Sequence, residues 1–482
     1  MRSGPNRWFV LVLVCIAQFM VILDATIVNV ALPSIQKALD ITPASLQWIV
    51  NAYTLVFGGF LLLGGRAADL LGRQRLFIAG VIIFTAASLL NGLANSEGVL
   101  IAGRALQGFG GALVSPAALS IVTTTFAEGK ERTQALGVWS AIAAGGGAVG
   151  LVLGGFLTEA FSWRWVFFIN LPIGIAAALL SLRYVPNSRA EKRPETYDVA
   201  GAVTVTGGLL VLVYAIVKAQ SYGWGSGKTI GLFVVALLLL AAFVAIEQRS
   251  KAPLIRLGIF RLRSLSGSNV AMLLVASGLF AMFYFASLYL QGILGYKPLQ
   301  AGFAFLPFTL GIVIGAGASQ ALIRRIGIRL VSYIGITMGA IGLLYFGRLP
   351  VDGSYVRDVL PTILVVSIGM GMTFVPLTLL ATTNVASEDA GLASGLFNTS
   401  QQVGGALGLA ILSTLAASRT SHLLSEGPQT PAARADAVTS GYHVAFAVGA
   451  LMLVGALAVL AVTIRQRDVE QIDAGDVEMT PV

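Results

Sequence analysis

An aspartate and an arginine interrupt long apolar runs of this sequence, where ionisable side chains are rare. Asp24 lies inside the run 8–30, and Arg104 lies inside the run 99–121. An acid at membrane depth is costly, so it is usually neutral, paired with a base or placed on a water-filled path. Asp24 is therefore a candidate proton carrier. The alternative is a structural acid that is permanently paired.

The predicted partner of Asp24 is Arg104. Counted along helices that rise 1.5 Å per residue, Asp24 lies about 9 Å and Arg104 about 8 Å from the outer ends of their helices. The two charges therefore sit at similar depth. Pairing favours the charged carboxylate whereas burial favours the neutral acid, so the proton occupancy of Asp24 would shift as a cavity opens or closes. This balance predicts a proton-coupling site.

The composition places these residues in a membrane. The 482 residues are 56% hydrophobic and 11% charged, whereas a soluble protein carries about 25% charged residues. The single cysteine, Cys15, excludes disulfides and cysteine metal clusters, and two histidines leave few groups for a catalytic centre. We expect no enzyme activity, no metal and no cofactor besides a proton gradient. The net charge of +9 is spread between apolar segments, which argues against nucleic acid.

Stretches of roughly 20 apolar residues predict membrane-spanning helices. The sequence offers fourteen, so we expect an all-α polytopic membrane protein. The predicted spans are 8–30, 45–65, 76–94, 99–121, 134–157, 165–183, 199–217, 229–246, 268–292, 301–323, 329–347, 359–380, 394–417 and 441–463. The first is longer than the core of a signal peptide and is interpreted as a retained span.

The basic residues predict the orientation. Most of the 31 lysine and arginine residues fall on alternate loops, which become cytoplasmic when the N-terminus is placed inside. Both termini are therefore predicted to be cytoplasmic. The polar stretch 418–440 is expected to be an outer loop, and residues 467–482 a disordered acidic tail.

Four short motifs carry a resemblance to a known family. They are Gly65, Asp69, Gly72, Arg73 and Arg75 after the second span; Arg104, Gln107, Gly108 and Gly110 in the fourth; LDATIVNVALP at 23–33; and WRW at 163–165 with FINLPIG at 168–174. In this order the motifs resemble those of the major facilitator superfamily, specifically its fourteen-span drug:proton antiporter branch. Ala67 and Leu70 depart from the loop pattern.

The resemblance implies the major facilitator fold, with two six-helix halves related by pseudo-symmetry. The halves would be 1–195 and 251–466, with two extra transmembrane helices at 196–250. A degenerate copy of the loop after span two, with Arg324, Arg325, Gly327 and Arg329, supports this repeat. Transport would proceed by rocking of the halves. By the same resemblance, Arg104 would take part in proton transfer.

The loop after span two would form a cytoplasmic gate that closes when the cavity faces outward. Glu388 and Asp389 are its predicted partners, because acids near the start of a helix on the same side can pair with arginine. The gate residues are Gly65, Asp69, Gly72, Arg73, Arg75, Glu388 and Asp389. The alternative is an ordinary basic loop.

The fifth predicted span carries the antiporter glycine motif, Gly146, Gly150, Gly154 and Gly155. Small residues at this spacing let helix backbones approach closely. The glycines would serve either static packing or helices that slide on one another. Leu151 stands where the family pattern has proline, which puts the usual kink in question.

The predicted substrate cavity is lined by aromatic and amide side chains, with packing or lipid contact as the alternative for each. These residues are Asn29, Trp48, Tyr53, Gln107, Trp139, Phe280, Tyr284, Gln291, Phe305, Asn398 and Gln401. Together with Asp24, such aromatic surfaces would suit lipophilic cations.

These features predict a proton-coupled antiporter in a bacterial inner membrane that exports small amphipathic or cationic drugs. Its partners would be the substrate, protons and the lipid bilayer, and a periplasmic adaptor is left open. Three alternatives remain: an exporter dedicated to one metabolite or self-made antibiotic, a membrane sensor without transport, and a membrane-embedded enzyme.

Overall fold

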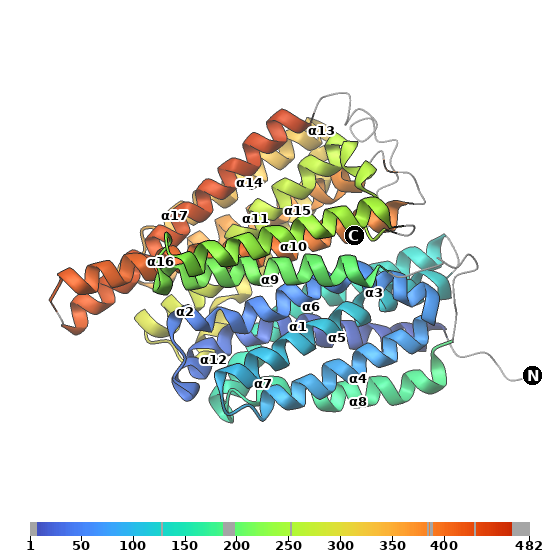
Figure 1. Ribbon diagram of the computed structural model, residues 1–482, viewed down its shortest axis with the longest axis horizontal. Coiled ribbons are helices and arrows are strands. Elements are labelled where there is room, and N and C mark those ends of the chain that lie inside the picture. The colour runs from blue at the N-terminus through green and yellow to red at the C-terminus, as the bar shows by residue number, and fades with distance from the viewer. Residues whose placement is uncertain are drawn as a thin grey trace, which may run out of the picture.

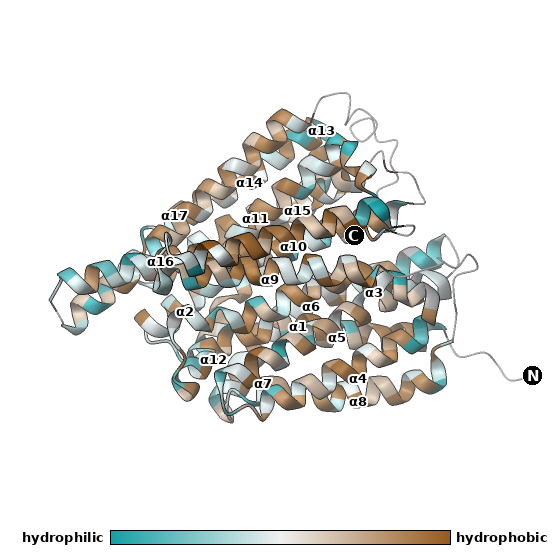
Figure 2. Cartoon of the chain, viewed as in Figure 1, coloured by the Kyte–Doolittle hydropathy of each residue, from teal (hydrophilic) through white to brown (hydrophobic). Residues whose placement is uncertain are grey.

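The computed structural model describes residues 7–126, 129–186, 198–250, 253–382, 385, 389–428 and 430–464. Over these residues the chain forms helices and no strand (Figure 1). Hydrophobic residues occupy much of the length of the helices, and hydrophilic residues gather mainly towards their two ends (Figure 2). This distribution is that of a protein surrounded by lipid.

The first half of the chain folds into six long helical segments and two short helices. Its elements are α1 (Arg7–Leu39), α2 (Pro43–Leu46), α3 (Trp48–Leu71), α4 (Arg73–Gly92), α5 (Glu97–Thr125), α6 (Lys130–Ala160), α7 (Trp165–Phe168) and α8 (Asn170–Tyr184). Local chemistry sets several ends. The Ser96 hydroxyl accepts the Val99 N–H at the start of α5, as an N-cap does.

Two inserted helices and the second half follow. Their elements are α9 (Val199–Tyr222), α10 (Gly227–Arg249), η1 (Leu257–Arg261), α11 (Arg263–Leu288), η2 (Tyr289–Ile293), α12 (Pro298–Ala304), α13 (Leu306–Ile326), α14 (Ile328–Phe346), η3 (Tyr355–Val359), α15 (Leu360–Thr382), α16 (Ala390–Glu426) and α17 (Pro431–Thr463). The hydroxyls of Ser226 and Thr430 cap α10 and α17.

A glycine with positive φ marks the same junction in each half. Gly72, between α3 and α4, has φ 102°, and Gly327, between α13 and α14, has φ 79°. Residues with a side chain rarely adopt this conformation. The shared conformation agrees with the internal repeat suggested by the two basic loops.

The helices match the predicted membrane spans. Thirteen are long and apolar enough to cross a membrane, and the described apolar part of α6, Gly145–Ala160, is shorter. Each of the fourteen predicted spans coincides with one of these helices, and the structure is consistent with that count. The all-helical fold class is therefore confirmed. The domain boundaries near 195 and 250 fall at or beside residues outside the described ranges and stay predictions, as does the acidic tail.

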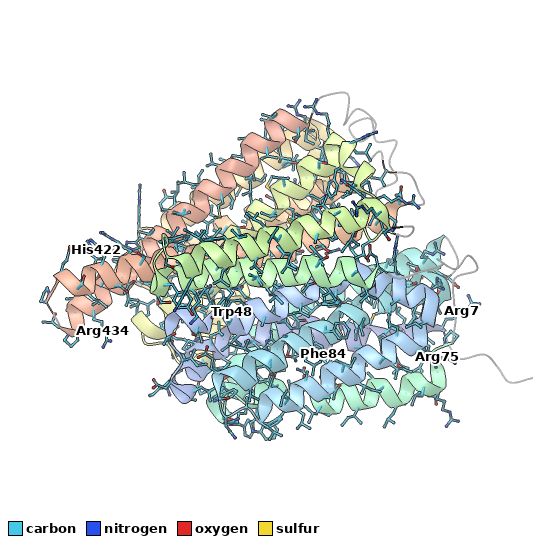
Figure 3. All side chains as sticks on the ribbon, viewed as in Figure 1. Arg7, Trp48, Arg75, Phe84, His422 and Arg434 are labelled. Carbon is cyan, nitrogen blue, oxygen red and sulfur yellow. The ribbon has the colours of Figure 1, made fainter. Side chains whose placement is uncertain are left out.

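The stretch 418–440 differs from its predicted form as an outer loop. It is largely helical, because α16 continues to Glu426 and α17 begins at Pro431. The two helices form a hairpin that projects beyond the bundle (Figure 1). His422 and Arg434 lie on this hairpin, at the opposite end of the molecule from Arg7 and Arg75 (Figure 3). The end with Arg7 is called the near end below, and the end with the hairpin the far end.

The two halves make polar contacts with each other near the far end. The Ser287 hydroxyl donates to the Asn29 carbonyl at 2.9 Å, and the Gln291 amide donates to the Val30 carbonyl at 2.9 Å. The Ser413 hydroxyl also donates to the side chain of Gln47 at 2.5 Å. Towards the near end, residues of both halves line a cavity, beside which the Thr399 hydroxyl donates to the Gly58 carbonyl at 3.2 Å. The structure is therefore closed at the far end.

Candidate functional site

Asp24 and Arg104 form an ion pair in the middle of the first half, as predicted. An Nη of Arg104 donates to Oδ2 of Asp24. The two side chains are 0% and 1% exposed. A buried charge without its partner is strongly destabilising, so each side chain depends on the other.

Two amide side chains and a backbone carbonyl hold the pair in one geometry. Gln107 and Asn170 donate their amide N–H groups to Oδ1 of Asp24 at 2.6 and 2.9 Å. Arg104 also donates to the side-chain oxygen of Gln107 at 2.7 Å and to the Ile49 carbonyl at 3.0 Å. The network thus ties α1 to α5, α8 and α3. Gln107, which we predicted to line the substrate cavity, belongs to this network.

Two side chains of α4 complete the network. The Ser88 hydroxyl accepts from the Gln107 amide at 2.8 Å and donates to the Phe84 carbonyl at 2.8 Å; Phe84 is labelled in Figure 3. Asn91 donates to Gln107 at 2.8 Å. We did not predict Ser88, Asn91 or Asn170 as site residues. Asn170 could have been predicted, because it lies in the FINLPIG motif.

Tyr53, which we predicted to line the substrate cavity, instead packs against the network. The guanidinium carbon of Arg104 lies 4.3 Å from the centre of the Tyr53 ring, close enough for a cation–π contact. Gly108 makes this approach possible, because a Cβ at that position would lie 2.4 Å from the Tyr53 carbonyl oxygen. The buried α3–α5 contact thus positions the ion pair.

The hydrogen bonds around Asp24 suit an ionised carboxylate. Both oxygens of Asp24 accept hydrogen bonds from N–H donors, so the network is built around the carboxylate. A proton on either oxygen would weaken its bond to a donor. Taking up a proton at Asp24 would therefore loosen α1 from α5 and α8.

A cavity of about 730 Å³ lies between the halves towards the near end. Two of the predicted cavity residues, Trp139 and Asn398, lie on its wall. The wall combines apolar and hydroxyl side chains with three charged ones. Its remaining residues are Gln18, Phe57, Leu61, Leu62, Gly65, Arg66, Ser115, Pro116, Leu119, Ser120, Thr123, Leu254, Arg256, Asp389, Gly391, Leu392, Ser394 and Gly395. Asp24 is not among them.

The other predicted cavity residues lie elsewhere in this conformation. Trp48 faces a second cavity of about 730 Å³, bordered by Tyr214 and Lys218 of α9. Tyr284 and Phe305 are buried in the second half, and the Phe280 ring packs against Gly405. Gln291 and Asn29 join the halves near the far end, and Gln401 is half-buried. Helix phase could not be inferred from sequence where every face is apolar.

Only some residues of the predicted cytoplasmic gate lie in the described part of the chain. Arg75 is exposed and Arg73 half-buried beside the turn at Gly72, and Gly65 lies on the cavity wall. Glu388 and the side chain of Asp69 fall outside the described part of the chain. Asp389 pairs with Arg256 of its own half at 3.1 Å. Since the gate would close only when the cavity faces the other way, it stays a prediction.

The glycine motif brings α6 against α1 and against the second half. A Cβ at Gly150 would lie 2.0 Å from the Thr26 hydroxyl, and one at Gly154 2.6 Å from the Ile27 carbonyl. Gly146 faces Phe19 and Ile22 of α1 at 3.1 Å or more. Gly155 instead faces α12, with the Pro298 carbonyl at 2.5 Å. The motif therefore serves both close packing and the contact between halves.

Replacing Gly155 by Ala should disfavour the conformation closed at the far end. The added methyl would strike the Pro298 carbonyl, which costs roughly 1–3 kcal/mol if the helices cannot shift. We expect slower transport and reduced labelling of a cysteine placed at Ser115 in a Cys15→Ser background. Gly147→Ala is the matched control, because nothing lies within 4 Å of that position. Equal labelling in the two variants would contradict the prediction.

A helical bundle of two halves, with a cavity between them and a buried ion pair inside one half, is the architecture of a secondary transporter. The family model described as Major Facilitator Superfamily matches residues 14–409. The chain belongs to this superfamily, whose members are transporters rather than enzymes.

Two relatives are designated as an antibiotic resistance protein and an antibiotic export protein. The chain is 41% identical to the puromycin resistance protein pur8 of Streptomyces alboniger, over 99% of this chain and 95% of that protein. It is 42% identical to the cephamycin export protein CmcT of Amycolatopsis lactamdurans, over 85% of each chain.

The fold also matches solved transporters. A crystal structure of a bacterial homologue of the human lysosomal transporter Spinster, inward-facing and unoccupied, superposes with a TM-score of 0.69 at 16% identity. The match covers 96% of this chain and 97% of that one. At this identity the likeness supports the fold.

Proposed function

We propose that the protein is a proton-coupled antiporter that exports amphipathic antibiotics from the cytoplasm. The observation that carries this proposal is the buried pair of Asp24 and Arg104, held by amide donors. Such pairs inside a membrane mark ion and substrate pathways. The Tyr53 ring contacts Arg104 and stacks on Phe57 of the cavity wall, so it lies between the pair and the cavity.

The proposed cycle uses the orientation predicted from the basic loops. The near end then faces the cytoplasm of a bacterial inner membrane, and the cavity is open to substrate from that side. Rocking of the halves would expose the cavity at the far end, where the substrate leaves and a proton binds Asp24. During the return, Asp24 would release its proton towards the near end, and the bond to Arg104 would then re-form as in the conformation seen here.

The cavity wall favours an amphipathic substrate with an aromatic group. Trp139 and Phe57 offer aromatic surface, while Gln18, Ser115 and Asn398 offer hydrogen bonds. Because Asp24 is fully buried in this conformation, we do not assign it a direct contact with a cationic substrate. We propose that charge pairing with Asp24 is not required for binding.

A dedicated exporter is the second candidate. It is supported by the designations of the two relatives, each of which names one antibiotic. A panel of puromycin, cephamycin, ethidium and unrelated biocides separates the two candidates. Resistance confined to one chemical class would favour the dedicated exporter, and resistance to several would favour the multidrug exporter.

The proposed function is tested by transport into proteoliposomes that contain the purified full chain. We expect puromycin or ethidium uptake to follow an imposed pH gradient and to stop when an uncoupler removes the gradient. Uptake that is unchanged by the uncoupler would overturn proton coupling. No gradient-driven uptake of any compound in the panel would overturn the export function.

Replacing Trp139 by Ala should weaken export of an aromatic substrate. The lost contact is expected to cost roughly 1–2 kcal/mol, or about tenfold in apparent affinity. The concentration of puromycin that gives half-maximal transport measures this change. Trp224→Ala is the matched control, since Trp224 lies 58% exposed between α9 and α10. An unchanged half-maximal concentration in Trp139→Ala would exclude this side chain from substrate binding.

A further inference from the structure

Asn51, in the first turn of α3, carries a buried amide without a hydrogen bond. Its side chain is 0% exposed, and neither Oδ1 nor Nδ2 has a partner among the described residues. The other buried amide side chains there each make at least one hydrogen bond, as Gln47 and Gln107 do. An unpaired polar group destabilises the conformation that buries it. The present conformation therefore gives no reason for an amide at this position.

Asn51 lies on the face of α3 that packs against α16 of the other half. Gln47, one turn earlier, accepts the Ser413 hydroxyl at 2.5 Å. At Gly58, two turns later, a Cβ would lie 2.8 Å from the Cβ of Gln402. Residues four and seven positions apart share one face of a helix. The face of α3 that makes these two contacts with α16 therefore also carries Asn51.

The stretch of α16 opposite Asn51 is apolar. The two helices run antiparallel here, because Gln47 meets a later residue of α16 than Gly58 does. Asn51 lies between these two contacts, so it faces the stretch 406–410 of α16. The side chains buried in this stretch are Ala406, Leu409 and Ala410. They have no hydrogen-bonding group, which explains why the amide of Asn51 has no partner.

This part of the contact between α3 and α16 belongs to the closed far end. Phe57 of α3 lines the cavity, and Asn51 lies six residues further towards the far end, or about 9 Å along the helix. Trp48, three residues before Asn51, lies towards the hairpin in Figure 3. Asn51 is therefore covered only while the halves meet at the far end. When they part, water can both donate to the amide and accept from it.

We propose that Asn51 weakens the closure at the far end and thereby sets how often the two halves part there. The hydrogen bond between Gln47 and Ser413 stabilises the closed conformation, whereas the unpaired amide one turn away destabilises it. Opening breaks the hydrogen bond and hydrates the amide, so the two groups act in opposite directions on one equilibrium. An apolar side chain in place of Asn51 would hold the protein closed at the far end for longer.

The test measures opening without substrate. Ser287→Cys, in a Cys15→Ser background, places a thiol of nearly the same shape in a buried contact between the halves at the far end. Such a thiol reacts with a water-soluble maleimide only after the halves part. When reclosing is faster than the reaction, the labelling rate of the purified full chain follows the population of the open conformation.

We expect Asn51→Leu to slow this labelling about tenfold, the size expected for one unpaired buried polar group. Ser413→Ala should instead speed the labelling, because it removes a hydrogen bond between the halves. Asn398→Leu is the matched control, since it makes the same chemical change on the wall of the cavity, outside the closed contact. It should leave the labelling rate unchanged.

Asn51→Ala separates the amide from side-chain size. Leucine is larger than asparagine and alanine is smaller, so crowding affects only one variant and a void only the other. Slower labelling in at least one of them, with Asn398→Leu unchanged, would support the proposal. Labelling as fast as in the wild type, or faster, in both variants would overturn it. Equal slowing in Asn398→Leu would also overturn it.

Failure of this inference is distinguishable from failure of the proposed function, because the labelling needs neither a substrate nor a proton gradient. Proton-coupled export with unchanged labelling in the Asn51 variants would refute only the role of Asn51. Slower labelling in a protein that transports no compound of the panel would refute only the export function.

Discussion

Replacing Asp24 by Asn is expected to abolish proton-driven efflux while the protein still reaches the membrane. Asparagine retains an oxygen that can accept from Gln107 and Asn170, but it neither binds a transported proton nor neutralises Arg104. We expect gradient-driven transport to fall on the order of 100-fold or more, as when a proton carrier is removed. The measurement is uncoupler-sensitive ethidium or puromycin efflux at matched expression.

Asp40→Asn is the matched control for this substitution. Asp40 is exposed just after α1 and has a φ of 50°, a conformation that asparagine also tolerates. The same chemical change there should leave efflux unchanged. Full uncoupler-sensitive efflux in Asp24→Asn would contradict the prediction and show that Asp24 is a permanently paired structural acid.

Removal of Arg104 is expected to produce the largest loss of stability. Arg104→Gln would leave the carboxylate of Asp24 buried without its counter-charge, which costs about 3–5 kcal/mol. The double variant Asp24→Asn with Arg104→Gln leaves no buried charge and should recover much of that loss. The apparent melting temperature of the purified protein in detergent, measured for the four combinations, gives the coupling between the two residues.

An exposed ion pair provides the comparison. Arg7 and Glu131 lie 3.3 Å apart with about half or more of each side chain exposed, and such pairs contribute roughly 0–1 kcal/mol. The same cycle with Arg7→Gln and Glu131→Gln should show almost no coupling. Additive losses at Asp24 and Arg104 would mean that the buried pair is not an interdependent unit. Transport should not return in the double variant, because the proton carrier is absent.

The class of fold could be predicted because the membrane imposes a strong local rule. Backbone groups in lipid must bond within their own segment, so each long apolar run becomes a helix. The predicted spans agree with the helices for this reason. This rule did not predict the helices in the stretch 418–440, because polar residues outside the membrane can continue a helix without an apolar run.

The sequence by itself also determined that Asp24 and Arg104 would meet, because two rare charges at equal depth in an apolar bundle stabilise one another. Only the tertiary structure decided what surrounds them. Ser88 and Asn91 are ordinary residues of an apolar helix until close packing at Gly108 and neighbouring glycines brings α3, α4 and α5 together.

The tertiary structure likewise decided which side chains reach the cavity. Trp139 and Asn398 line it, whereas Tyr284 and Phe305 pack inside the second half. Sequence fixes how far along a helix a residue lies, through the rise per residue. It does not fix which way the residue points when every face is apolar, because that rotation depends on contacts between helices distant in the chain.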